Sequence, residues 1–154
     1  MAALASDRGL VSLSLPQTKP QLAFSHLVMK VSGAEHRPGA FHSLQMAMES
    51  HFKGEIVTVN EPLDWRHTSA FSRQVLEIVQ AIPPGQTMTY KDIAVQLGKP
   101  GAARAVGRAV SRNPFPLVVP CHRVVGSGGG LGGYRGGIKM KRRLLLLEGV
   151  RQIS

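Results

Sequence analysis

Cysteine is nearly absent from this sequence, which contains a single one among 154 residues. No disulfide can therefore form within the chain, which favours a reducing compartment: the cytoplasm or, in a eukaryotic cell, the nucleus. Long apolar runs are also lacking, since the longest, residues 144–147, is far below the roughly 18 residues of a membrane span. Residues 1–8 are apolar but too short, and too soon charged, for a secretory signal. We expect no association with a membrane.

Acidic residues are scarce and unevenly placed. The chain has 9 Asp and Glu against 19 Lys and Arg, a formal net charge of +10. Residues 1–70 contain six residues of each sign, so the positive excess lies in residues 71–154. Charge concentrated in one half of a chain favours a polyanionic partner such as nucleic acid. A basic surface without a specific partner is the alternative.

The first sixty residues have the pattern of a small α/β unit. Residues 10–15 and 22–31 have the composition of strands. Ser43 then precedes a helical pattern that ends at Gly54. The side chains predicted to share one face of this helix are Leu44, Ala47, Met48, His51 and Phe52.

Residues 60–64 contain a proline among polar residues and lie where the charge balance changes, so they are the predicted linker. We predict an N-terminal α/β domain over residues 1–66 and a mostly helical C-terminal domain over residues 67–154. Together these give an α+β fold class.

Three helices are predicted in the second half. Apolar residues keep a helical period over residues 71–82. Thr89 and Asp92 fit a capping box that opens a short helix, and residues 102–112 form another after a glycine-containing break. Two short helices joined in this way are the outline of a helix-turn-helix, although any helical hairpin would produce the same pattern.

The last of these helices has a basic face. Arg104, Arg108 and Arg112 follow i, i+4, i+8 and form an arginine stripe. Its neighbours are small, so the helix can approach a duplex closely and neutralise phosphates. A solvated charged face is the alternative, but such a face normally includes Asp or Glu. The residues predicted to pack inward are Ala103, Val106, Gly107 and Val110.

The lone cysteine, Cys121, stands directly before His122. A thiol becomes a good nucleophile only as thiolate, so it needs a base in contact and positive potential nearby. This stretch offers both, which makes Cys121 a candidate nucleophile. A small buried core cysteine is the alternative.

Several short motifs follow one another in the second half of the sequence, at residues 82–87, 90–94, 102–107, 113–114, 120–124, 132–134, 136–137 and 144–149. In their order and spacing they resemble the motifs of the O6-alkylguanine-DNA alkyltransferases, also called methylated-DNA–protein-cysteine methyltransferases. The resemblance implies a ribonuclease-H-like N-terminal domain and a C-terminal domain with a winged helix-turn-helix. It also implies that a damaged guanine is flipped from duplex DNA and that its O6-alkyl group passes irreversibly to the cysteine.

The resemblance also implies the catalytic residues. Cys121 is the nucleophile, and His122 and Glu148 form a relay with a water between imidazole and thiol. Tyr90 donates a proton at N3 of the leaving guanine and crowds the target phosphate. Lys141 supports the electrostatics of the tyrosine and the thiolate, although a phosphate contact is an alternative for a lysine in so basic a run.

Further residues are implied in DNA and substrate binding. Arg104 is the finger that fills the space of the extruded base, and Asn113 ties the recognition helix to the active-site loop. Arg135 departs from the small polar residue that many relatives carry there. The other predicted DNA-binding residues are Ala103, Arg108, Arg112 and Tyr90. The predicted substrate pocket comprises Tyr134, Gly132, Gly133, Arg135, Pro116 and Val124.

No cofactor is expected, because the protein would be both catalyst and final acceptor. The glycine-rich stretch before Tyr134 lacks the strand–turn–helix setting and downstream acid of a dinucleotide site. We also predict no metal, since the histidines of the first 67 residues have no cysteine partners. These histidines are His26, His36, His42, His51 and His67.

The predicted partner is double-stranded DNA that contains O6-alkylguanine, bound by a monomer, and the sequence leaves open whether binding is cooperative. Three other functions fit the sequence less well. An alkyltransferase-like protein that only flags the lesion would normally lack Cys121. A plain helix-turn-helix regulator would not explain the residues around Cys121, and a cysteine hydrolase would need an oxyanion-hole context that is missing.

Overall fold

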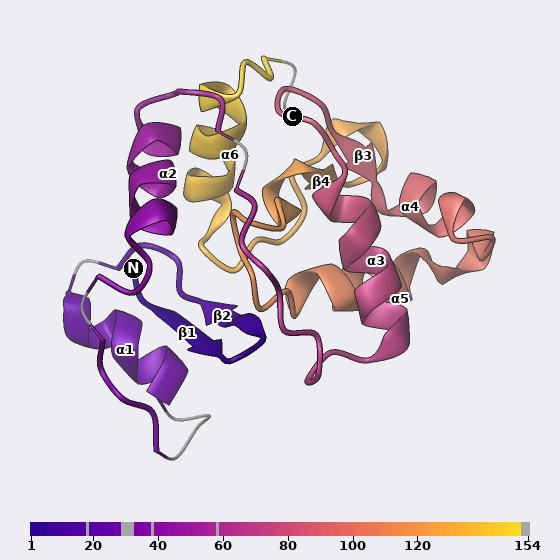
Figure 1. The fold of residues 1–154 in the computed structure, drawn as a ribbon. Coiled ribbons are helices and arrows are strands. Elements are labelled where there is room, and N and C mark those ends of the chain that lie inside the picture. The colour runs from indigo at the N-terminus through magenta and orange to yellow at the C-terminus, as the bar shows by residue number, and fades with distance from the viewer. Residues whose placement is uncertain (18, 29–32, 38, 58, 152–154) are drawn as a thin grey trace.

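The chain folds into helices and short strands (Figure 1), and the computed structural model describes residues 1–17, 19–28, 33–37, 39–57 and 59–151. The predicted mixture of helix and strand is confirmed. The strands are β1 (Ala3–Ser6), β2 (Gly9–Leu13), β3 (Met88–Thr89) and β4 (Val124–Val125). The α-helices are α1 (Pro20–Val28), α2 (His42–Phe52), α3 (Ala70–Gln80), α4 (Tyr90–Gln96), α5 (Ala103–Ser111) and α6 (Ile138–Leu147). Three 3₁₀ turns are η1 (Pro100–Ala102), η2 (Cys121–Arg123) and η3 (Ser127–Gly129).

The predicted strand over residues 10–15 is largely β2, which pairs antiparallel with β1. The predicted linker, residues 60–64, is not a loose connection. The backbone N–H of Leu10 donates to the carbonyl of Pro62 at 2.7 Å, and the N–H of Asp64 donates back to Leu10 at 2.8 Å. This segment therefore runs along the free edge of β2 and satisfies backbone groups that the hairpin leaves unpaired.

The predicted strand over residues 22–31 is wrong, because the described part of this segment belongs to α1, and residues 29–31 lie outside the described residues. Pro20 opens the helix, where its missing N–H costs nothing. Ala23 and Leu27, spaced i, i+4, are buried against Ala2. The local composition suits either structure, and this one-sided burial decides for the helix.

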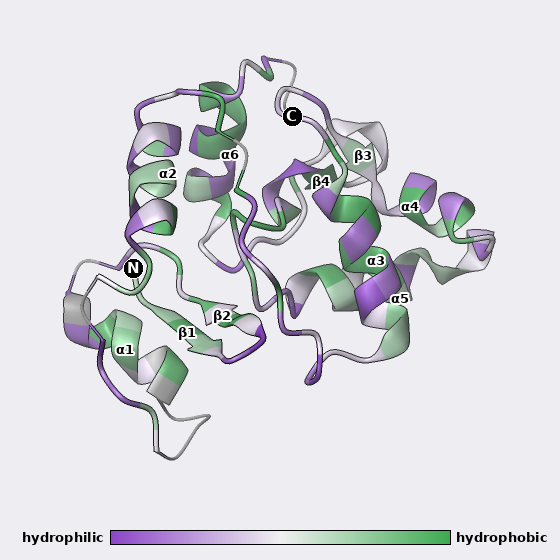
Figure 2. Ribbon diagram, in the orientation of Figure 1, coloured by the Kyte–Doolittle hydropathy of each residue, from purple (hydrophilic) through white to green (hydrophobic). Residues whose placement is uncertain are grey.

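The predicted helix after Ser43 is confirmed as α2, whose buried side chains are Leu44 and Met48. Both belong to a hydrophobic core that also contains Val75 and Val79 of α3 and Leu144 of α6. One continuous core therefore spans the predicted boundary between domains. Figure 2 shows hydrophobic and hydrophilic residues in bands along α3 and α4, as expected for helices with one buried face.

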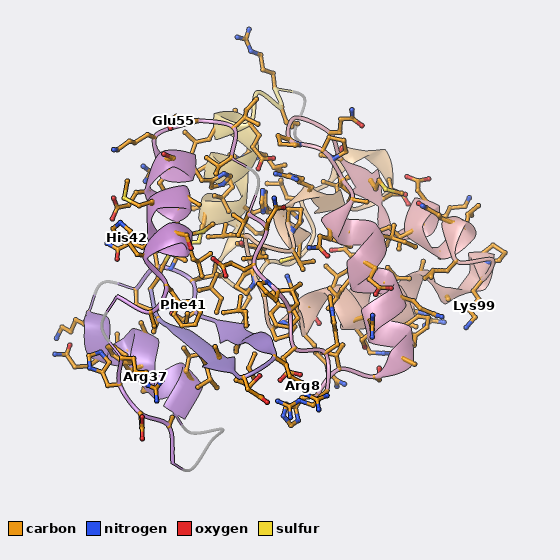
Figure 3. The ribbon with its side chains drawn as sticks, viewed as in Figure 1. Arg8, Arg37, Phe41, His42, Glu55 and Lys99 are labelled. Atoms are coloured by element: carbon orange, nitrogen blue, oxygen red, sulfur yellow. The ribbon has the colours of Figure 1, made fainter. Side chains whose placement is uncertain are left out.

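The C-terminal helices follow the predicted pattern. The helix predicted over residues 71–82 is α3, which begins after Ser69, whose side chain accepts from the N–H of Ser72. α3 and α4 both pack against α5, and η1 makes the turn between α4 and α5. Lys99 lies at the outer tip of that turn (Figure 3). A parallel pairing of Met88 with Val124 joins β3, just before α4, to β4, just after Cys121.

The described residues before α3 contain a two-stranded sheet and two helices. Their ribonuclease-H-like assignment and the two-domain division stay predictions. Within the described ranges, each helix is too short or too polar to span a bilayer.

Replacing Thr89 by Ala tests the capping box that starts α4. The Thr89 side chain accepts from the N–H of Asp92, and the Asp92 carboxylate accepts from the N–H of Thr89. Losing the cap should lower the free energy of unfolding by about 1 kcal/mol, measured by urea denaturation. Thr87→Ala, at an exposed position outside the cap, is the matched control. Equal effects of the two substitutions would contradict the cap.

Candidate active site

Cys121 lies in η2 at the end of a buried loop and is 8% exposed. Asn113, at the end of α5, holds this loop: its Nδ2 donates to the carbonyl of Val119 at 2.8 Å, and its Oδ1 accepts from the N–H of Phe115 at 2.9 Å. The Asn113 side chain also acts on the Cys121 thiol and opposes the rise in its pKa that burial causes. Leu117 adopts a positive φ of 74° within the loop, a strained conformation for a side chain with a Cβ. The tie predicted for Asn113 is therefore present in the geometry.

The carboxylate of Glu148, just after α6, lies at the centre of a buried ion-pair network. Its Oε1 is 2.8 Å from Nε2 of His122, which is fully buried. Arg123 donates from Nε to Oε2 and from Nη2 to Oε1, both at 2.9 Å. Nη1 of Arg123 donates to the carbonyl of Ile82, at the end of α3. The predicted contact between His122 and Glu148 is thus formed, and Arg123 fixes it from the other side.

Burial leaves the thiol and the imidazole neutral at rest. It raises the pKa of Cys121 above its usual value, against the opposing effects of Asn113 and Lys141. It lowers the pKa of His122, although Glu148 opposes that shift. Burial also raises the pKa of Glu148, but hydrogen bonds from His122 and Arg123 outweigh it and bring the value to about 2. The site thus holds a neutral thiol, a neutral base and a permanently charged carboxylate.

Lys141 is fully buried, so a surface contact with phosphate does not explain it. Its Nζ donates to the backbone carbonyls of Val124 and Leu131. Burial lowers the pKa of Lys141 to about 8, while the nearby Cys121 acts in the opposite direction. The ammonium therefore lies close enough to the thiol to favour its ionised form.

Tyr90 and Tyr134 both lie near the thiol. Tyr90, the first residue of α4, is half-buried, and burial and the neighbouring Cys121 raise its pKa. A Cβ at Gly132, where φ is +61°, would lie 3.2 Å from the Tyr90 hydroxyl, so this close approach favours glycine. The hydroxyl of Tyr134 is buried and has no hydrogen-bond partner among the described residues. Burial, followed by Cys121 and Glu148, raises the pKa of Tyr134.

The remaining predicted pocket residues fall into two groups. Pro116 and Val124 are buried beside the Cys121 loop, whereas Gly133 and Arg135 are exposed in the segment before α6. Arg135 still acts electrostatically on the Cys121 thiol and favours its ionised form. The predicted pocket residues thus combine buried apolar side chains with an exposed cation that acts on the thiol.

The arginine stripe of α5 faces solvent. Arg104, Arg108 and Arg112 are all exposed, whereas Val106 and Val110 are buried against α3 and α4. Ala103 is half-buried, and Gly107 faces the Tyr90 ring, which a Cβ there would approach to 3.8 Å. The predicted basic and inward faces are both confirmed.

Two site residues were missed by sequence reasoning. The sequence gives Arg123, within residues 120–124, no separate role. It places His51 only on one face of a predicted helix and among histidines that lack cysteine partners for zinc. His51 Nε2 lies 4.0 Å from Oε1 of Glu148. The helical period of α2 did place His51 toward the core, but only tertiary structure brings it to Glu148.

His51, His122 and Glu148 each present a ligand atom within 4.8 Å of the others, a spacing that could suit a metal ion. Both oxygens of Glu148 already accept from Arg123. A divalent cation would have to displace or repel that guanidinium. The arrangement favours an ion-pair network over a metal site.

Comparison with known proteins identifies the family. Residues 70–150 match the model of the 6-O-methylguanine DNA methyltransferase, DNA binding domain. A methylated-DNA–protein-cysteine methyltransferase of Mycobacterium bovis is 48% identical over 111 residues, a match covering 72% of this chain and 67% of that protein. A protein of the same name from Methanothermobacter thermautotrophicus is 51% identical over 88 residues, covering 57% of this chain and 49% of that protein.

Solved structures of similar proteins support the same family. The crystal structure of Mycobacterium tuberculosis OGT in complex with DNA superposes with a TM-score of 0.78 at 40% identity, covering 94% of this chain and 83% of that one. The O6-methylguanine-DNA methyltransferase of Pyrococcus kodakaraensis gives a TM-score of 0.73 at 26% identity, covering 96% and 90%. The chain therefore belongs to the methylated-DNA–protein-cysteine methyltransferase family.

Proposed function

We propose that this protein repairs DNA by one irreversible transfer of the alkyl group from O6-alkylguanine in a duplex to Cys121, after the base is flipped out. The observation that carries the proposal is the lone cysteine, buried beside a neutral imidazole that a charged carboxylate orients. A nucleophile, an oriented base and its counter-charge are the parts that an activated thiol requires.

Base flipping follows from where the thiol lies. Cys121 is buried, so an alkyl group on a base within the duplex stack cannot reach it. We assign α4, η1 and α5 as a helix-turn-helix, with the segment before α6 as its wing. The exposed stripe on α5 meets the phosphates, and Arg104 enters the duplex to fill the space of the extruded base.

The transfer moves one alkyl group and two protons, one from the thiol to His122 and one from Tyr90 to guanine. The thiol proton passes to Nδ1 of His122, which has no hydrogen-bond partner among the described residues, directly or through one water. The thiolate attacks the alkyl carbon, and the bond from that carbon to O6 breaks as the sulfur–carbon bond forms. The electron pair remains on guanine, which takes a proton from the Tyr90 phenol. The raised pKa of Tyr90 keeps this phenol protonated before the reaction. Glu148 stabilises the imidazolium throughout.

The transfer occurs once per molecule. Its product is a neutral thioether, and breaking its sulfur–carbon bond would expel a thiolate, which is a poor leaving group in a buried site. The sequence contains no second cysteine that could accept the alkyl group and restore the thiol. Each protein molecule is therefore consumed by one lesion.

Replacing Cys121 by Ser tests the acceptor. Transfer from an O6-methylguanine duplex should become undetectable, while the Kd for DNA should stay within about twofold, because the substitution leaves the basic face unchanged. Intact mass spectrometry of the wild type should show the gain of one methyl group per chain. An unmodified wild-type chain beside an unrepaired lesion would refute the proposal. If that wild-type protein still binds the lesion, the result would instead indicate a protein that only flags it.

Replacing Arg104 by Ala tests the finger. The transfer rate on duplex DNA should fall about tenfold, because no side chain then fills the space that the flipped base leaves in the duplex. The rate on free O6-benzylguanine, which needs no flipping, should change less than about twofold if that base fits the pocket. Arg37→Ala removes the same charge from an exposed residue of the N-terminal part and is the matched control. Equal losses on both substrates would contradict a finger.

Replacing Glu148 by Gln tests the relay through pH. Glu148 has a folded pKa of about 2 and an unfolded value of about 4.3, so its charge stabilises the fold above the unfolded value. The advantage of wild type over E148Q in free energy of unfolding should be complete at neutral pH. It should shrink as pH falls from about 4.5 toward about 2, measured by chemical denaturation.

The same variant should transfer the alkyl group about tenfold to a hundredfold more slowly near pH 8, because the imidazolium loses its counter-charge. A stability difference that does not change with pH would show that Glu148 is uncharged in the folded protein.

A further inference from the structure

His51 reaches the relay from the N-terminal part of the chain. It lies in the last turn of α2, and its side chain is 12% exposed. Its Nε2 is 4.0 Å from Oε1 of Glu148, the oxygen that faces Nε2 of His122. The centroids of the two imidazole rings are 6.1 Å apart. Two histidines from distant parts of the sequence thus face one carboxylate oxygen.

The His51 Nε2 is buried and has no hydrogen-bond partner among the described residues. Buried polar atoms are nearly always bonded, so such an atom calls for an explanation. A cavity of about 10 Å³ is lined by His51, Arg123 and Glu148, together with the chain just after α2. That volume is near the minimum for one water, which could bridge Nε2 to the carboxylate. The position of the His51 ring therefore suits a polar interaction with the Glu148 carboxylate, in addition to packing.

Packing holds His51 in this position. Phe52 contacts the ring edge-on, with centroids 5.8 Å apart. α2 ends at Phe52, and Gly54 follows two residues later with a φ of +89°. A Cβ at Gly54 would lie 3.6 Å from the Leu147 side chain. The end of α2 is thus docked on the end of α6, immediately before Glu148.

We propose that His51 makes alkyl transfer sensitive to pH: when His51 becomes protonated, it competes with His122 for the Glu148 carboxylate and so slows the transfer. This inference rests on the proposed function. It assigns to the N-terminal part a role in the chemistry besides scaffolding.

The sign of the effect follows from the charges around the ring. Glu148 attracts a proton on His51, whereas His122 and Arg123 repel it, and Glu55 lines the same cavity from the loop after α2. Burial dominates and lowers the pKa of His51. When His51 is neutral, it does not compete with His122 for the Glu148 carboxylate. Protonated His51 draws the carboxylate toward itself and repels a second positive charge, so His122 becomes a weaker base for the thiol.

His51 should protonate before His122 as pH falls, because His122 is fully buried whereas His51 retains some exposure. The wild-type transfer rate should therefore fall in two steps. The first is a partial loss of about threefold that follows His51, since a weaker base accepts the thiol proton more slowly. The second is the complete loss when His122 itself becomes charged.

The experiment measures single-turnover transfer at saturating O6-methylguanine duplex between about pH 8 and pH 5.5. His51→Gln and His51→Phe should match wild type within about twofold at pH 8 and should lack the first step, with the Kd for DNA unchanged. His42→Gln is the matched control, because His42 lies on the same helix and points outward from it (Figure 3). This control should retain both steps.

Two outcomes would overturn the proposal. One is an unchanged pH profile in His51→Gln. The other is a loss of rate that is equal at every pH and accompanied by a lower Tm, which would mean that His51 serves packing alone.

A second measurement needs neither transfer nor DNA, so it separates failure of this inference from failure of the proposed function. Ring NMR signals should show His122 titrating at a higher pH in His51→Gln than in wild type, because a repelling charge has been removed. An unmoved midpoint would refute the coupling. If neither variant folds, the wild type alone decides: each of the two rings should titrate in two phases, and a single independent phase for each would refute it.

Discussion

The carboxylate of Glu148 is the interaction on which the rest of the site depends. It is buried and charged, so it needs partners that satisfy both of its oxygens. His122 and Arg123 supply them, and Arg123 also reaches the carbonyl of Ile82. One carboxylate therefore joins the ends of α3 and α6 to the turn that carries Cys121. The geometry of the nucleophile and the stability of this corner of the fold have the same cause.

Burial keeps the Cys121 thiol in its neutral, less nucleophilic form. A thiolate exposed to solvent would be open to oxidation and to chance alkylation. Here burial keeps Cys121 protonated, while Asn113 and Lys141 favour the thiolate without overcoming that effect. The charge therefore need develop only as the alkyl carbon approaches. Lys141 is itself destabilised as a cation by burial, and two backbone carbonyls hold it in place.

The N-terminal part shares its core with the catalytic part. Residues 60–64 continue the pairing of β2, and the N–H of Leu13 donates to the carbonyl of Pro114 in the loop that leads to Cys121. α2 in turn ends against Leu147, beside the relay. The first sixty residues therefore contact both the loop that leads to Cys121 and the end of α6 that leads to Glu148.

Local pattern determined much of this protein. The capping box of Thr89, the arginine face of α5 and the period of α2 depend on neighbours within a few residues, so the sequence alone predicts them. The motif around Cys121 also predicts a nucleophile, because it places a base directly beside the only thiol of the sequence. The strand predicted over residues 22–31 is wrong, because an apolar stretch suits either a strand or a helix until its buried face is known. The second partner of Glu148, Arg123, and the approach of His51 depend on contacts between segments far apart in the chain, which only the tertiary structure decides.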